Sequence, residues 1–305
     1  MDRDSVSWQG YIPAITTPFT EDGAFDAARL HELIEWLVGE GMHGIVVAGT
    51  TGEWFSMQPE EKAELFRETG NAVRGRIPVI AGCNAYTARE AIASAAAAEA
   101  AGLDGILLTP PPYVRPCERE LVAFYADVDR DVRLPICVYN WPPGTNLDMR
   151  RETLERLADL ERVVAIKNST ADPDHFLDVL RTLGDRVRVF GVTMDETGAR
   201  LVREHGAAGT MGAGAVLGDT HPGFFNALWA GKLDEALGHG RRDRTIMSEW
   251  FNPDLTAKFG SAQAVFKAAL NLQGLPGGFP RRPILPLEPS EIEVLRKTLK
   301  SLGRL

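Results

Sequence analysis

The chain has 305 residues, of which 44% are hydrophobic and 25% charged, and its formal net charge is −9 at pH 7. These proportions are ordinary for a soluble globular protein that can bury a large core. The negative charge argues against a non-specific grip on nucleic acid or anionic lipid, because both require clustered lysine and arginine.

The N-terminal segment and the cysteines favour a cytoplasmic location. The segment MDRDSVSWQGYIP has acidic residues and no apolar core of the kind a secretory signal needs. No apolar run reaches the length of a membrane span. Cys83, Cys117 and Cys137 are odd in number and lack C-x-x-C spacing, so neither a disulfide framework nor a zinc site is indicated. We expect a protein of the reducing cytoplasm that binds neither nucleic acid nor membrane.

Short β-type runs alternate along the chain with longer helical patterns. The helices have recognisable starts, with Asp26 as an N-cap and Thr87 with Glu90 as a capping box. A weak repeat places a glycine where a helix would end and a second glycine just before a strand. The eight predicted strands cover residues 11–17, 44–50, 77–82, 105–110, 134–140, 163–168, 187–191 and 208–214.

This alternation predicts the fold class. Eight strand and helix units in roughly 220 residues suit a closed (β/α)8 TIM barrel, which we assign to residues 1–223. The alternative is an open doubly wound sheet, but no G-x-G-x-x-G motif follows the first strand. Residues 224–305 have the pattern of helices joined by loops. We therefore expect an α/β barrel followed by a C-terminal helical region.

Catalytic side chains in such barrels come from the C-terminal ends of the strands and the loops that follow. The six histidines are scattered, and none falls at a strand end, which disfavours a metal-dependent aldolase. The residues that do fall there are Thr50, Thr51, Glu53, Asn84, Tyr113, Tyr139, Asn140, Lys167, Gly191 and the glycine-rich stretch 209–218.

Lys167 is the unusual member of this set because it ends the apolar run VVAIK, whereas the other six lysines lie in helical patterns with polar neighbours. A lysine at an apolar barrel mouth is desolvated, which lowers its pKa and makes a neutral amine available. Such an amine attacks a ketone to form a Schiff base, whose iminium withdraws electrons from the adjacent bond. Two tyrosines and a threonine, Tyr113, Tyr139 and Thr50, are suited to relay protons there.

Each of these residues also has a structural interpretation. A lone lysine at a strand end is usually solvated, and GTTGE (49–53) by itself reads as a tight turn. Tyr139 could be a core tyrosine and Tyr113 a cap of the barrel. The combination of these residues at strand ends favours the catalytic interpretation.

Three motifs in order, GTTGE (49–53), YNWP (139–142) and AIKNST (165–170), resemble those of the class I pyruvate-dependent Schiff-base lyases. This family includes dihydrodipicolinate synthase and N-acetylneuraminate lyase, and the resemblance runs from residue 10 to at least residue 218. It implies reversible aldol cleavage or condensation of a 2-oxo acid, with pyruvate as donor or product, an aldehyde partner and no cofactor beyond the lysine Schiff base. The alternatives are a dehydratase or deaminase of a 2-oxo sugar acid, a dihydrodipicolinate synthase and, least favoured, a non-catalytic binding barrel.

The resemblance also implies roles for individual residues. Lys167 would form the Schiff base, Tyr139 would donate and accept protons beside it, and Thr50 would link Tyr139 to Tyr113. In the family the tyrosine matching Tyr113 reaches into the neighbouring subunit's site, which implies a homodimer, commonly paired into a homotetramer. The pyruvate pocket would be lined by Thr50, Thr51, Gly191 and Met211.

Specificity is expected to depend on Gly144, in YNWPPGTNLDM (139–149). Dihydrodipicolinate synthases would place an arginine there to bind the carboxylate of an amino-acid semialdehyde, and a buried carboxylate without a cation is costly. We therefore expect poor dihydrodipicolinate synthase activity. Trp141 and Trp54 would add apolar bulk near the mouth or, alternatively, pack in loops or at a subunit contact. Asp195 and Glu196 would face the distal part of the substrate.

Overall fold

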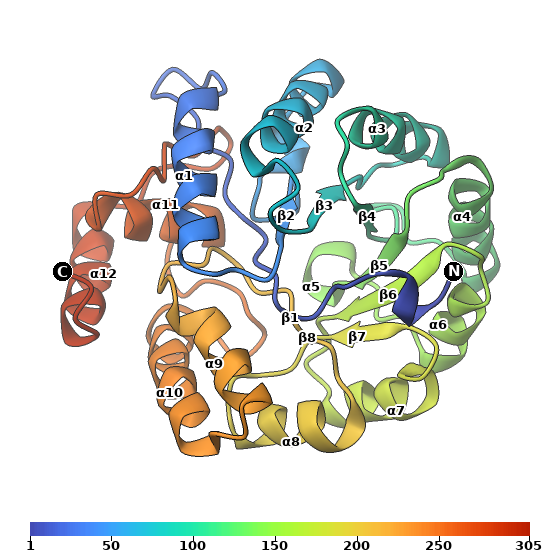
Figure 1. Cartoon of the computed structure of the whole chain (residues 1–305). Coiled ribbons are helices and arrows are strands. Elements are labelled where there is room, and N and C mark those ends of the chain that lie inside the picture. Colours follow the sequence, from blue (N-terminus) through green and yellow to red (C-terminus); the bar gives the residue numbers. More distant parts are fainter.

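The computed structural model describes all 305 residues and shows a barrel, which Figure 1 views close to its axis. The parallel strands are hydrogen-bonded in the order β1-β8-β7-β6-β5-β4-β3-β2. The ring closes just after β1, where Ala14 forms a parallel bridge with Val46 of β2. The strands are β1 (Gly10–Tyr11), β2 (Ile45–Val47), β3 (Val79–Gly82), β4 (Gly105–Leu108), β5 (Ile136–Asn140), β6 (Val163–Asn168), β7 (Arg188–Phe190) and β8 (Gly209–Thr210).

The predicted (β/α)8 barrel is therefore confirmed; β6 has the bounds expected from the sequence, and the other seven strands are shorter than expected. Helices surround the sheet, and short 3-10 helices lie at Arg3–Ser5 (η1) and Trp54–Ser56 (η2). None of the helices combines the length and the apolar character that a membrane-spanning segment requires. The helices up to residue 229 are α1 (Ala27–Gly39), α2 (Pro59–Val73), α3 (Ala88–Ala100), α4 (Glu118–Asp131), α5 (Pro142–Thr145), α6 (Arg151–Ala158), α7 (Pro173–Leu183), α8 (Glu196–His205) and α9 (Thr220–Trp229).

Local signals in the sequence set the ends of these helices. The Asp26 carboxylate accepts a hydrogen bond from the backbone of the first turn of α1, and Thr87 with Glu90 forms the expected capping box of α3. Gly206 follows α8 with φ of 68°, a left-handed conformation that glycine adopts without steric cost.

The C-terminal region consists of α10 (Leu233–Trp250), α11 (Ala262–Leu272) and α12 (Pro289–Ser301). These helices lie on the side of the barrel that carries α1 and α9 (Figure 1). The predicted division at residue 223 lies within α9 and stays a prediction. Side chains on both sides of it, such as Leu217, Trp250 and Leu295, belong to one apolar cluster.

The barrel interior is apolar from its base to the level of the active-site candidates. Trp8 fills the base, and a Cβ on Gly105 would lie 2.4 Å from the Trp8 ring, so only glycine fits there. Val46, Ile80 and Phe190 occupy the interior above. An ionisable group at the mouth therefore lies against apolar side chains, which disfavours its charged form.

Candidate active site

Lys167 and Tyr139 lie side by side at the C-terminal ends of β6 and β5. The two residues are register partners, and the Lys167 Nζ atom lies 4.0 Å from the centre of the Tyr139 ring. Lys167 is 8% exposed and Tyr139 is 4% exposed. The pairing of parallel strands therefore brings together the two residues that the sequence placed at the centre of the chemistry.

Burial lowers the pKa of Lys167 from 10.5 to about 8. No carboxylate forms an ion pair with its Nζ atom. The neighbouring Cys137 adds no negative charge near neutral pH, because burial raises the pKa of its thiol to about 12. Lys167 is therefore a buried amine without a counter-ion, which is the condition for a neutral nucleophile.

Lys267 contradicts the expectation that the six other lysines all have polar surroundings. It lies on α11 and is only 1% exposed, less than Lys167. Its ammonium pairs with the buried carboxylate of Glu53 and donates to the Phe279 carbonyl at 2.7 Å. Burial lowers the pKa of Lys267 to about 8, and Glu53 opposes that shift. The two buried lysines therefore differ in having or lacking a carboxylate partner.

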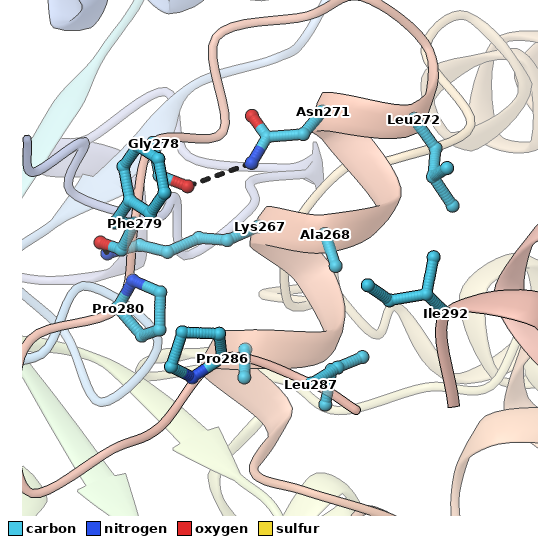
Figure 2. A pocket seen from close by; sticks show the side chains of 11 residues that line it. Lys267, Ala268, Asn271, Leu272, Gly278, Phe279, Pro280, Pro286, Leu287 and Ile292 are labelled. Carbon is cyan, nitrogen blue, oxygen red and sulfur yellow. Dashed lines mark hydrogen bonds between the residues drawn. The ribbon is translucent and has the colours of Figure 1, made fainter. Parts of the chain in front are cut away.

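Lys267 also lines a cavity of about 280 Å³ between α11, α12 and the segment that joins them (Figure 2). The lining residues come from 264–292 only, and none stands at a strand end. We therefore locate the candidate site by the strand-end residues and not by this cavity.

The hydroxyl of Tyr139 has Ser169 as its polar neighbour. Burial raises the pKa of Tyr139, and a hydrogen bond with Ser169 opposes the rise. Ser169 was not singled out from the sequence. It stands two residues after Lys167, and side chains two apart on extended backbone face the same side. That spacing was the signal that could have identified it.

The proposed proton relay is not assembled within a single chain. Thr50 is half-buried, and no hydrogen bond joins its hydroxyl to Tyr139. Tyr113 follows β4 with φ of 76° and is 95% exposed, so its ring makes little contact with its own chain. Its expected place in a neighbouring subunit's site stays a prediction.

The loop after β2 presents a row of free backbone donors. The N–H groups of Thr50, Thr51 and Gly52 make no hydrogen bond within the chain, although Thr51 is only 7% exposed. The Thr50 carbonyl accepts from Gln263 Nε2 at 3.0 Å and from the Glu53 N–H at 3.1 Å. In a trans peptide the N–H points opposite to the preceding carbonyl, so the Thr51 N–H points away from α11. Successive free N–H groups form a concavity that binds anions.

Gly191 and Met211 lie at the ends of β7 and β8. Gly191 has φ of 137°, and a Cβ there would lie 2.3 Å from the Asn168 carbonyl oxygen, so glycine is required. The Met211 side chain is buried in the same interior cluster as Tyr139, with its Sδ atom 3.9 Å from Cys137 Sγ. Both residues are placed at the barrel mouth, as their proposed pocket role requires.

Trp141 and Gly144 form one unit beside Tyr139. The Trp141 ring stacks on Tyr139 with centroids 6.0 Å apart and an interplanar angle of 23°. A Cβ on Gly144 would lie 2.3 Å from Trp141 Cδ1. The indole of Trp141 therefore occupies the space in which a side chain at position 144 would begin.

The other candidate specificity residues have structural contacts of their own. Trp54 packs against Phe55 and Tyr86, each at a centroid distance of 6.3 Å. Asp195 is the N-cap of α8 and accepts from the Gly198 N–H at 2.9 Å. Glu196 is the exposed first residue of that helix. Their expected contacts with a substrate stay predictions.

The histidine, cysteine and carboxylate side chains do not gather into any group of three or more that could hold a metal ion.

Comparison with known proteins covers almost the whole chain. Residues 7–302 match the Dihydrodipicolinate synthetase family. A relative from Rhizobium meliloti, named uncharacterized DapA-like lyase, is 35% identical over 298 residues and 97% of each chain. A 4-hydroxy-tetrahydrodipicolinate synthase from Synechococcus sp. is 33% identical over 96% of this chain and 94% of its own. Among solved structures, the chloride-inhibited dihydrodipicolinate synthase from Acinetobacter baumannii, complexed with pyruvate, has a TM-score of 0.86 and 30% identity over 98% of this chain and 100% of that chain.

The resemblance expected from three short motifs is thus confirmed over nearly the full length of the chain. The family has lyase activity that depends on pyruvate and on a lysine Schiff base. The chain belongs to the dihydrodipicolinate synthetase family and is a pyruvate-dependent lyase of the Schiff-base kind.

Proposed function

We propose that this enzyme catalyses the reversible aldol cleavage or condensation of a 2-oxo acid, with pyruvate as donor or product and an aldehyde as the second substrate. The observation that carries this proposal is Lys167, a buried lysine with no carboxylate partner that lies beside a buried tyrosine. The row of free N–H groups at residues 50–52 supports it, because a 2-oxo acid has a carboxylate next to its reacting carbonyl.

The reaction would proceed through covalent bonds to Lys167. In condensation, its neutral amine attacks the keto carbon of pyruvate, and loss of water gives an iminium. Loss of a methyl proton then gives an enamine, which forms a carbon–carbon bond to the aldehyde carbonyl while the aldehyde oxygen takes up a proton. Water finally releases the product and the amine.

Tyr139 is the group we assign to the proton transfers. Its hydroxyl is protonated at physiological pH, as in an ordinary tyrosine, and burial raises its pKa further, so it can donate a proton and then recover it. Ser169, which lowers the pKa of that hydroxyl, gives it a polar neighbour in an otherwise apolar interior. Thr50 and Thr51 would hold the carboxylate of pyruvate through their backbone N–H groups and hydroxyls.

Borohydride reduction in the presence of pyruvate tests the covalent step. The reduced adduct should add a stable lactyl-type mass to the peptide that contains Lys167, and Lys167→Ala should abolish it. A label on another lysine would contradict the assignment. EDTA should leave the labelling and the turnover unchanged, and inactivation by EDTA would instead support a metal-dependent reaction.

We further propose that the aldehyde lacks a carboxylate at the position that an arginine at residue 144 would serve. Glycine offers no charge there, and the stacked Trp141 ring presents an apolar surface beside Tyr139. The assay compares pyruvate with aspartate semialdehyde against pyruvate with neutral aldehydes, and mass spectrometry identifies the products. Efficient synthesis from the semialdehyde would make the protein a dihydrodipicolinate synthase. Turnover of a 2-oxo sugar acid without carbon–carbon cleavage would point to a dehydratase or deaminase.

The exposed ring of Tyr113 supports the proposal of a homodimer or homotetramer in which it completes a neighbouring site. Mixed oligomers test this arrangement. Lys167→Ala and Tyr113→Phe subunits should each be impaired alone, but a hybrid dimer would contain one site with both native residues and should recover activity. No recovery in verified hybrids would contradict a shared site. The cytoplasmic location stays a prediction.

A further inference from the structure

We propose that α11 positions the carboxylate-binding loop through two contacts, Gln263 to the Thr50 carbonyl and Lys267 to Glu53. This inference rests on the proposed role of Thr50 and Thr51 in binding the 2-oxo acid. It gives Glu53, Gln263 and Lys267 a positioning role, although none of them touches the reacting atoms.

The loop at residues 49–52 has an unusual backbone at both ends. Ala48 has φ of 52° and Glu53 has φ of 60°, both in the left-handed region that non-glycine residues seldom adopt. Such conformations persist only where the surrounding structure holds them. A Cβ on Gly82 would lie 2.1 Å from the Ala48 carbonyl oxygen, so β3 confines the first end of the loop.

The second end is held from the C-terminal region. Glu53 is fully buried, and its carboxylate pairs with Lys267 and accepts the Arg281 N–H at 2.9 Å. Gln263 is also buried and donates to the Thr50 carbonyl at 3.0 Å. The two contacts fix the direction of one peptide carbonyl and the end point of the loop.

One face of α11 carries these contacts. Gln263, Lys267 and Asn271 are spaced four residues apart, so they lie along one side of the helix. Asn271 donates to the Gly278 carbonyl at 2.9 Å, and Lys267 extends to the same segment at Phe279 (Figure 2). This polar stripe in an otherwise apolar helix faces the loop at one end and the 278–279 segment at the other.

The consequence for binding follows from the geometry of the Thr50–Thr51 peptide. Gln263 holds the carbonyl toward α11, which holds the Thr51 N–H in the opposite direction. Without that contact only the Glu53 N–H still holds the carbonyl, so the peptide can rotate more freely and the direction of the Thr51 N–H is less well fixed. Positioning of this kind should strengthen binding of the carboxylate more than it accelerates the chemical step.

A pair of glutamine variants tests the first contact. Gln263→Leu removes the bond to the loop. Gln273→Leu, just after α11, removes bonds to the Val216 and Ala269 carbonyls, both at 3.0 Å and outside the loop. Trapping of Lys167 by borohydride is measured against pyruvate concentration. Gln263→Leu should raise the half-saturating concentration about three- to tenfold, the value of one hydrogen bond, and change the maximal rate less than about twofold. Gln273→Leu should leave both values within about twofold.

The charged pair gives the second test. Lys267→Met leaves the Glu53 carboxylate buried without a cation and should destabilise the chain, whereas Glu53→Gln with Lys267→Met removes both charges and should recover much of the stability. If the pair positions the loop, the pyruvate concentration that gives half-saturation stays at least about threefold above the wild-type value in the double variant. If the half-saturating pyruvate concentration and the urea midpoint both return toward their wild-type values, the pair has a structural role only and the inference is overturned.

The outcomes separate this inference from the proposed function. If Lys167 is labelled in the wild-type protein and the two glutamine variants need the same pyruvate concentration for half-saturation, only the positioning role is overturned. No labelling of the wild-type protein by pyruvate would overturn the proposed function and the positioning role together.

Discussion

The pH dependence of Schiff-base formation gives the sharpest test of the site. Burial places the pKa of Lys167 at about 8 instead of 10.5. At pH 7 this raises the neutral fraction of the amine from about 0.03% to about 10%, roughly a 300-fold gain. Because only the neutral amine attacks the keto carbon, the rate of adduct formation should rise tenfold per pH unit up to about pH 8 and then level off.

The assay incubates the protein with pyruvate between pH 6 and pH 10, traps the adduct with borohydride after set times and quantifies the labelled peptide by mass spectrometry. N-acetyl-lysine amide supplies the profile of a solvated lysine. The peptide with Lys267 supplies an internal control, because that lysine is also buried but is paired with Glu53 and should stay unlabelled.

Two results would refute the reasoning. A rate that still rises tenfold per unit above pH 9.5 would show that the interior does not desolvate Lys167. Labelling of Lys267 to a similar extent would show that burial by itself, and not the missing carboxylate, decides which lysine reacts.

Three further predictions follow from the same contacts. Tyr139→Phe keeps the ring beside Lys167 and removes the hydroxyl, so turnover should fall by about 10²–10⁴-fold with an unchanged circular dichroism spectrum, and near-normal activity would make Tyr139 a packing residue. Lys167→Met should stabilise the chain at pH 7 by about 3 kcal/mol in urea titrations, because the native state no longer buries an ammonium. Since the pKa of Lys167 is depressed in the folded state, this gain should shrink as the pH rises from about 8 to 10.5. A gain that stays constant over that range would contradict the prediction. Gly144→Arg must displace the Trp141 ring, so kcat/KM with a neutral aldehyde should fall about tenfold, and an unchanged value would show that Trp141 moves freely.

Much of the fold could be predicted because its signals are local. Alternation of short apolar runs with helical periodicity follows from the geometry of strands and helices, and caps such as Asp26 act within one turn. The strands were predicted too long at β1 and β8, where the apolar pattern continues into extended segments at the barrel mouth. The sequence pattern records burial, whereas a strand also requires a hydrogen-bonded neighbour.

The candidate site was predictable to the extent that it depends on strand ends. Lys167 and Tyr139 end neighbouring strands, so a parallel barrel had to bring them together. The sequence did not reveal that Lys267 is the more buried lysine, since its partner Glu53 lies 214 positions away. An apolar stretch around a lysine was visible in AVFKAAL, but apolar neighbours cannot tell a reactive amine from one half of an ion pair.

The sequence by itself determined the eight β/α units, the helix ends and the position of Lys167 at the end of an apolar strand, because these depend on residues within a few positions of one another. Only the tertiary structure decided that Lys167 lacks a counter-ion, that Trp141 fills the space beside Gly144 and that α11 holds the Thr50 carbonyl. Desolvation, ion pairing and steric exclusion depend on atoms that meet in space, and residues such as Thr50 and Gln263 meet only when the barrel has closed.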